Sequence, residues 1–201
     1  MRARYKITRY AMAIVMCGAL LVGCGTKEQE LKTSGLVIDE ELSIEATIVK
    51  PFDETLYNVA ELKTMMDSEA ADYNAVVGAG HVTAGDASVQ DGIVNAVMTY
   101  ASAEDYASFN SRYLKIRGLG AAINEGMIGV ALKDLKNDSI VNLTSIEDTD
   151  GLYLVVTDEV GTVTCPGKVL YISDGVDAKT KNAVTVTDNM DGLAYIIFKL
   201  K

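Results

Sequence analysis

The sequence predicts a single compact α+β domain after an N-terminal leader, with antiparallel sheets, about two amphipathic helices and a strand-rich C-terminal half. Three observations predict it. Apolar residues alternate with polar ones over 42–49 and 94–100, which is typical of half-buried strands. They recur every three or four residues over 59–74, which is typical of a helix. Asp-Gly pairs at residues 91, 150, 174 and 191 separate short apolar runs.

The first elements are predicted to be a hairpin and a helix. Residues 36–39 and 42–49 form two short strand candidates, and Ile44, Ala46 and Ile48 share one face of the second. Asn58 followed by Glu61 is typical of a helix start, and the apolar stripe then runs to about residue 74.

A second hairpin and a second helix follow. Residues 81–100 have period two around the Asp91-Gly92 pair, which favours a tight turn. Ser102, with Asp105 three residues later, predicts another helix start. Because Tyr106, Phe109 and Tyr113 have helical spacing, we expect this short helix to pack all three aromatic rings.

The remaining chain is predicted to be mostly antiparallel strands. The strand candidates cover residues 152–157, 169–173, 183–187 and 193–200. Residues 118–145 follow neither period, and their glycines weaken any helix there. The sequence therefore assigns no structure to that region.

The N-terminus has the three parts of a secretory leader. Arg2, Arg4, Lys6 and Arg9 make it positive, and the stretch from Ala11 to Val22 is apolar apart from one Cys and one Gly. That stretch is about a dozen residues long, whereas a membrane-spanning helix needs about 20. We therefore interpret residues 1–23 as a signal peptide.

The end of the leader, Leu21-Val22-Gly23-Cys24, resembles the lipobox of bacterial lipoproteins. The resemblance implies diacylglyceryl transfer to the Cys24 thiol and cleavage between Gly23 and Cys24. Two or three acyl chains hold a protein stably on a bilayer, whereas one does so weakly. Residues 24–34 are then the lipidated cysteine and a polar tether, and residues 35–201 are the extracellular domain.

Net charge argues against some partners. The leader holds four of the 18 basic residues and none of the 28 acidic ones, so its removal takes the formal net charge from −10 to −14. Nucleic acids and anionic lipid surfaces attract clusters of Lys and Arg. We therefore expect no nucleic-acid partner and a solvated, acidic surface.

Residues for chemistry are few. After the leader and the lipidated Cys24, Cys165 is the remaining cysteine and His81 the sole histidine, so the sequence offers no internal disulfide and little for a zinc site. His81 could activate Cys165 as a nucleophile, but a buried structural Cys165 is favoured. We expect no metal and no cofactor, and the sequence identifies no catalytic residue.

Several blocks of the chain resemble a group of uncharacterised lipoproteins from Gram-positive anaerobes. The blocks are residues 52–53, 57–63, 69–74, 100–110, 166–176 and 194–199. The resemblance implies a membrane-held extracellular domain and carries no activity with it.

The function expected from the sequence is thus that of a lipid-anchored protein on the extracytoplasmic face of the cell membrane. We expect a non-enzymatic module that binds an envelope protein, a polymer or a small solute. The alternative is a small envelope hydrolase that uses carboxylates or a Cys165/His81 pair.

Overall fold

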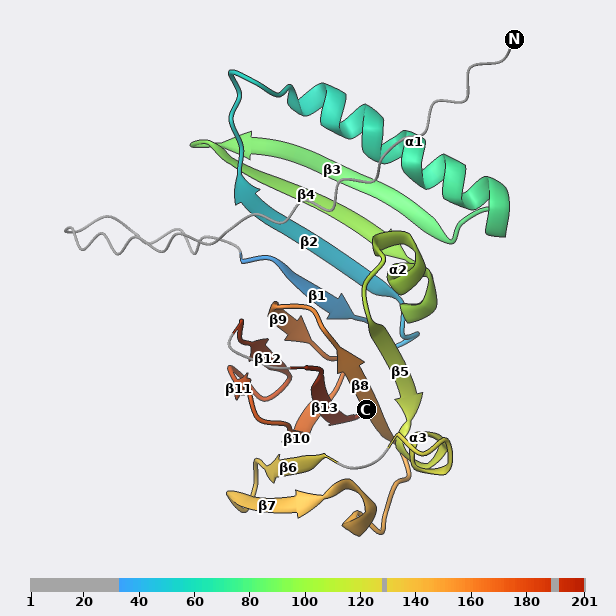
Figure 1. The fold of residues 1–201 in the computed structure, drawn as a ribbon, viewed down its shortest axis with the longest axis vertical. Coiled ribbons are helices and arrows are strands. Elements are labelled where there is room, and N and C mark those ends of the chain that lie inside the picture. The colour runs from blue at the N-terminus through green and yellow to red at the C-terminus, as the bar shows by residue number, and fades with distance from the viewer. Residues whose placement is uncertain (1–32, 128–129, 189–191, 201) are drawn as a thin grey trace, which may run out of the picture. The chain divides into compact units, whose positions relative to one another are not determined.

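The computed structural model describes residues 33–127, 130–188 and 192–200. These described residues make one compact unit of two sheets and three α-helices, so the predicted α+β class with a strand-rich C-terminal half is confirmed (Figure 1). Gly23, Cys24 and the tether up to residue 32 lie outside the described residues, so their assignments stay predictions.

The first sheet has seven strands in the order β11-β12-β9-β1-β2-β4-β3. Its strands are β1 (Gly35–Ile38), β2 (Ile44–Pro51), β3 (Val82–Gln90), β4 (Ile93–Tyr100), β9 (Gly161–Thr164), β11 (Val176–Ala178) and β12 (Ala183–Val186). Neighbouring strands are antiparallel except for β1 and β9, which run parallel. Both predicted hairpins, β1–β2 and β3–β4, are confirmed.

Local signals fix the β3–β4 hairpin and the helix that precedes it. Asp91 and Gly92 both have positive φ, 52° and 72°, which matches the right-handed twist of the flanking strands. Helix α1 (Val59–Val77) starts where Asn58 Oδ1 accepts a hydrogen bond from the Ala60 N–H at 2.8 Å. It ends at Val77, three residues later than predicted, with Gly78 as its C-cap, and its buried Met66 and Ala70 pack in the same core as β3 and β4.

Helix α2 (Ala103–Asn110) leads from the first sheet to the second. Ser102 caps it as predicted, because its Oγ accepts a hydrogen bond from the Asp105 N–H at 3.1 Å. The prediction that Tyr113 belongs to this helix is wrong. Ser111 adopts the left-handed conformation at φ 54°, which ends the helix, and Tyr113 packs in a different core cluster from Tyr106.

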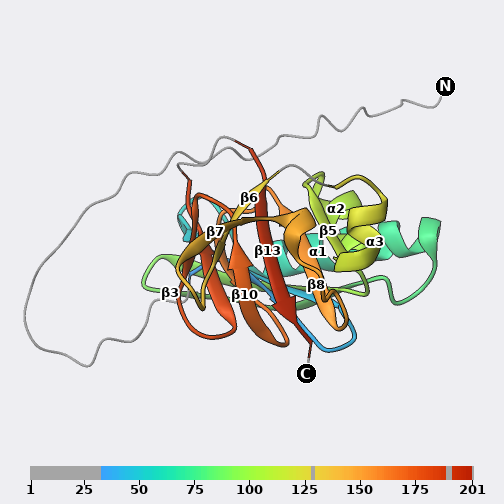
Figure 2. The same cartoon turned by 90° about the horizontal axis from the view of Figure 1, so that it is seen from below.

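The second sheet has six strands in the order β5-β8-β13-β10-β6-β7. Its strands are β5 (Leu114–Gly118), β6 (Ala131–Asp134), β7 (Ser139–Asn142), β8 (Leu152–Thr157), β10 (Lys168–Ile172) and β13 (Ala194–Lys199). The region without a predicted structure contains α3 (Leu119–Asn124), β6, β7 and the 3-10 turn Leu143–Ser145. Figure 2 shows β13 between β8 and β10.

Strand β13 is buried on both faces, which explains its continuous apolar sequence. Ile196 and Phe198 belong to the larger core, which is shared with the first sheet, while Ile197 belongs to a smaller core with Leu119 of α3. Strands buried on both sides are unbroken apolar runs rather than alternating ones. The second sheet is therefore a middle layer between the first sheet and α3.

The described chain bonds to the first sheet from its first residues. Ser34 Oγ donates to the Val49 carbonyl at 3.0 Å and accepts from the Val49 N–H at 2.9 Å. The Ser34 carbonyl accepts from the Thr162 N–H at 3.2 Å. Ser34, the last residue of the predicted tether, is thus held between β2 and β9.

Candidate functional site

Helix α2 carries two polar clusters, and the first is centred on Asp105. This carboxylate is buried, with 7% of the residue exposed. Its Oδ1 bonds to His81 Nδ1 at 2.9 Å and accepts from the Tyr73 hydroxyl at 3.1 Å, while its Oδ2 accepts from the Ser102 hydroxyl at 2.7 Å. Three segments, the end of α1, the start of β3 and the start of α2, thus meet at one side chain.

These bonds determine the ionisation of Asp105. Burial alone would raise its pKa, but the hydrogen bonds from Ser102, His81 and Tyr73 outweigh it and hold the pKa below its usual value. Asp105 is therefore a carboxylate at neutral pH. Conversely, burial and the nearby Asp105 raise the pKa of Tyr73, so its phenol stays protonated and donates.

His81 is the exposed member of the first cluster. Its side chain is 42% exposed, and it follows the turn that links α1 to β3. Because Asp105 is ionised, His81 Nδ1–H donates to it, and among the described residues Nε2 has no hydrogen-bond partner. A Cβ built on Gly78 would lie 3.5 Å from that Nε2, so glycine leaves this side of the ring open. The arrangement directs Nε2 away from Asp105, toward the open side of the ring.

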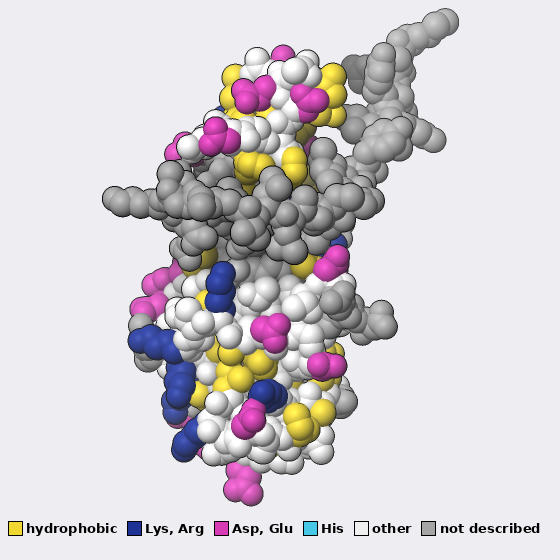
Figure 3. Space-filling view, turned by 90° about the vertical axis from the view of Figure 1, so that its left-hand side faces the viewer, with side chains coloured by type: hydrophobic (Ala, Val, Ile, Leu, Met, Phe, Trp, Pro, Cys, Tyr) yellow, Lys and Arg dark blue, Asp and Glu magenta, His cyan; other side chains and the backbone are white. Residues whose placement is uncertain are grey.

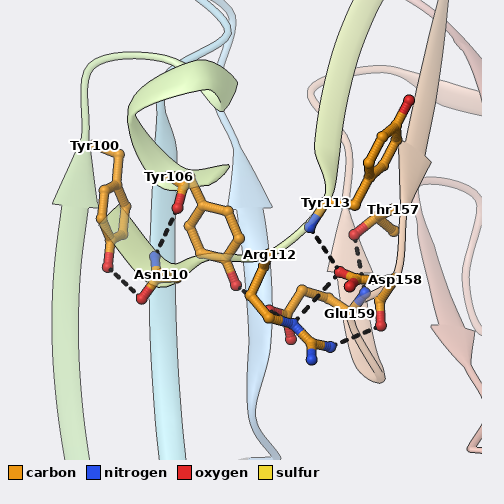
Figure 4. Close-up of polar contacts among 8 residues, drawn as sticks. All are labelled: Tyr100, Tyr106, Asn110, Arg112, Tyr113, Thr157, Asp158 and Glu159. Carbon is orange, nitrogen blue, oxygen red and sulfur yellow. Dashed lines mark hydrogen bonds and ion pairs between the residues drawn. The ribbon is translucent and has the colours of Figure 1, made fainter. Parts of the chain in front are cut away.

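The second cluster joins α2 to the segment after β8 (Figure 4). The Tyr106 hydroxyl donates to Glu159 Oε1 at 2.5 Å, and Arg112 Nε donates to the same oxygen at 2.9 Å. Arg112 also donates to the Asp158 carbonyl at 2.8 Å, and Asp158 Oδ1 accepts from the Tyr113 N–H at 3.0 Å. The cluster holds the β8–β9 connection against the segment that leads into β5.

Aromatic packing supports this second cluster from within the core. The Tyr100 and Tyr106 rings meet edge to face at 5.0 Å, and Phe109 packs on Tyr100 at 5.7 Å. Burial, together with the charge of Glu159, raises the pKa of Tyr106, and burial raises the pKa of Tyr100 to about 12. Both phenols therefore stay neutral. With Arg112 paired to both carboxylates and its phenols fixed, the cluster is built as a clamp between the two sheets.

The structure does not bring His81 and Cys165 into contact. Cys165 follows β9, is 1% exposed and donates its backbone N–H to the Asn182 carbonyl at 2.8 Å, so its predicted burial is confirmed. Burial raises the pKa of its thiol to about 12, which opposes formation of the reactive thiolate. Within residues 33–127, 130–188 and 192–200, no hydroxyl or thiol bonds to His81.

The described residues hold no cluster of three His, Cys, Asp or Glu side chains with the spacing of a metal site. None of the helices that the structure describes is both long and apolar enough to cross a bilayer. At the Asp150-Gly151 turn, the Asp150 N–H donates to Asp148 Oδ1 at 3.2 Å, so the Asp148 carboxylate is used within the turn.

The sequence did not identify the roles of four residues of these clusters, namely Asp105 as an acceptor, Arg112, Asp158 and Glu159. The spacing from Ser102 identified Asp105 as part of a helix start, and the single histidine drew attention to His81. No local sequence pattern connected Asp105 with His81. Comparison of the chain with protein-family models, with curated proteins and with solved structures yields no match.

Proposed function

We propose that this protein is a lipoprotein, anchored through acyl chains on Cys24 to the extracytoplasmic face of a bacterial membrane, and that its acidic domain is a non-enzymatic binding module. The observation that carries the proposal is the short distance along the chain between the lipobox cysteine and Ser34, which is bonded into the first sheet. Cys24 precedes Ser34 by ten residues, and Ser34 already bonds to β2.

That distance limits where the domain works. Ten residues span at most about 36 Å even when fully extended. A domain of about 170 residues has a radius of gyration of about 15 Å, so its diameter is comparable to the greatest length of the tether. The proposed anchor would therefore keep the point where the chain enters the domain within about one domain diameter of the membrane.

The anchoring is tested by metabolic labelling with an alkyne analogue of palmitate in a bacterial host that expresses the full chain. We expect the wild-type protein to carry label and to sediment with membranes, and Cys24→Ala to carry none. Cys17→Ala and Cys165→Ala are matched controls that should keep the label. An unlabelled wild-type protein, or label that persists in Cys24→Ala, contradicts the proposal.

The binding role is supported by large apolar side chains that the fold holds at the surface, with Leu56 and Tyr57 adjacent in sequence. Proximity crosslinking on intact cells that express the full chain tests it. We expect enrichment of specific envelope components over a Cys24→Ala control. Equal recovery from both would contradict a binding role at the membrane.

A second candidate function is hydrolysis in the envelope, and the His81–Asp105 pair favours it. A half-exposed imidazole oriented by a buried carboxylate is suited to act as a general base on water. Incubation of the protein with isolated cell wall tests this candidate. Release of soluble fragments that His81→Gln abolishes and Cys165→Ala preserves would support it, whereas no release from the wild type would rule it out.

A further inference from the structure

The loop between β2 and α1 holds three large apolar side chains, Phe52, Leu56 and Tyr57, which we call the apolar tip. Leu56 is 72% exposed and Tyr57 is 56% exposed. The Phe52 and Tyr57 rings pack against each other with their centres 5.9 Å apart. The tip therefore presents an aliphatic and an aromatic side chain to solvent side by side.

Hydrogen bonds hold this loop in a defined conformation. Asp53 Oδ1 accepts from the Thr55 N–H at 2.9 Å and from its hydroxyl at 2.6 Å, and the Asp53 carbonyl accepts from the Tyr57 N–H at 2.9 Å. The Phe52 N–H donates to the Gly92 carbonyl at 2.7 Å, which ties the loop to the β3–β4 turn. The apolar side chains of the tip are thus held at the surface by the fold, because the backbone is fixed on both sides of Leu56.

The apolar tip lies at the end of the first sheet where the chain enters. Ser34 bonds to Val49, two residues before β2 ends at Pro51, and the loop follows directly. Pro51 pairs with Ile93, so the β3–β4 turn lies at this end as well. In Figure 3, which views this side, hydrophobic side chains show at the surface of the upper part, with acidic side chains among them.

We propose that the apolar tip rests in the lipid–water interface of the same bilayer that holds Cys24. The inference builds on the proposed function, since the predicted tether brings this end of the sheet to the membrane. Tyrosine favours the headgroup region, where its ring is shielded and its hydroxyl stays hydrated. The anchor raises the effective concentration of lipid at the tip, so a contact too weak to hold a free protein still forms.

Charge around the tip sets the lipid preference. Asp53, Glu54 and Asp91 lie in the same loop and turn, against Lys50 at the end of β2. An excess of carboxylates is repelled by anionic headgroups. The contact is therefore shallow, and it is stronger on phosphatidylcholine than on membranes that contain phosphatidylglycerol.

The chain contains no tryptophan, so a single introduced one reports on its own position. The lipidated full chain carrying Leu56→Trp is reconstituted into phosphatidylcholine vesicles that contain brominated lipid, which quenches nearby indoles. Interfacial side chains lie about 5–10 Å into the boundary between headgroups and acyl chains, within reach of such quenchers.

Val76→Trp is the matched control. Val76 is also apolar and highly exposed, at 85%, but it lies near the C-terminal end of α1, whose 19 residues span about 28 Å. The following strand β3 starts at Val82 opposite Tyr100, at the other end of the sheet from the apolar tip. A protein that is anchored but does not contact lipid at the tip leaves both indoles equally unquenched.

We expect the indole of Leu56→Trp to be quenched at least about threefold more than that of Val76→Trp, with blue-shifted emission. Phosphatidylglycerol should reduce the difference. Flotation with vesicles and the mass of the lipidated protein are measured on the same samples. Equal quenching of the two indoles in floating, lipidated protein overturns this inference and leaves the proposed function standing. A blue shift of the Leu56→Trp emission without quenching has the same consequence, because it would mean that protein covers the tip. Absence of lipid on Cys24 overturns the proposed function and this inference together.

Discussion

The hydrogen bond between Tyr106 and Glu159 provides a quantitative test of the clamp between the two sheets. Tyr106→Phe removes the hydroxyl that donates to Glu159 Oε1 at 2.5 Å. Hydrogen bonds to charged groups contribute about 1.5–3 kcal/mol to stability. Because Arg112 still donates to the same oxygen and water reaches the partly exposed Glu159 side chain, we expect the free energy of unfolding to fall by about 1.5 kcal/mol.

Glu159→Ala should cost more, about 2–3 kcal/mol, because it leaves the buried Tyr106 hydroxyl without its acceptor. When both partners are replaced by apolar groups, that penalty disappears. Tyr106→Phe in the Glu159→Ala background should therefore be nearly neutral. The coupling energy between the two positions is about 1.5 kcal/mol, within the range found for contacting residues.

Urea unfolding at neutral pH measures these values. For a slope of about 2 kcal/mol/M, a change of 1.5 kcal/mol moves the midpoint by about 0.7 M. Tyr171→Phe is the matched control, since its hydroxyl forms no hydrogen bond among the described residues. If Tyr106→Phe lowers stability equally with and without Glu159, the bond does not contribute to the clamp and the reasoning is refuted.

Three further predictions concern ionisation, packing and reactivity. The pKa of Asp105 is lowered on folding, so its contribution to the free energy of unfolding is present above its unfolded pKa of about 3.9 and is lost as pH falls through the folded value. Asp105→Asn should therefore flatten the pH dependence of the free energy of unfolding, measured in urea between about pH 5 and 2. Gly167→Ala should lower the free energy of unfolding in urea by about 3 kcal/mol, because the new Cβ would lie 1.7 Å from the Lys199 carbonyl oxygen. The control Gly118→Ala places a Cβ with no atom within 4 Å and should cost far less. The Cys165 thiol should resist iodoacetamide in folded protein at pH 8 and react fully in urea, as mass spectrometry would record; rapid reaction of the folded protein would contradict its burial.

The parts of the fold that the sequence predicts are those with a local physical cause. Asn58 and Ser102 each satisfy a free N–H at a helix start within three residues of themselves. Asp91 and Gly92 adopt the positive φ that a two-residue hairpin requires. Such signals act over a few residues, so one sequence is enough to interpret them.

The unpredicted part, residues 118–145, depends on contacts with distant strands. Strands β6 and β7 have four residues each, too few for a period to stand out, and β6 is placed by pairing with β10 through Tyr171 and Asp134. Helix α3 has six residues and no side-chain cap. Its position is fixed by the burial of Leu119 and Ala122 in the smaller core, which no local pattern encodes.

Tyr113 illustrates how a correct period can give a wrong element. Its spacing from Tyr106 and Phe109 suits a helix, but Ser111 turns left-handed and the chain enters β5. The Tyr113 N–H then bonds to Asp158, 45 residues later. The competing interaction comes from the second sheet, and tertiary contacts override helix propensity.

The candidate site has the same mixture of local and distant causes. The cap formed by Ser102 places Asp105 at the start of α2, but its role as acceptor depends on Tyr73 and His81, which lie 32 and 24 residues away. Neighbouring residues on a helix point about 100° apart. Asp105 thus faces the α1–β3 turn while Tyr106 faces Glu159 beyond β8, so a single turn of α2 serves both clusters. Because both clusters depend on the start of α2, the Ser102 cap positions the exposed imidazole and the clamp together, and a change that frays this turn acts on both.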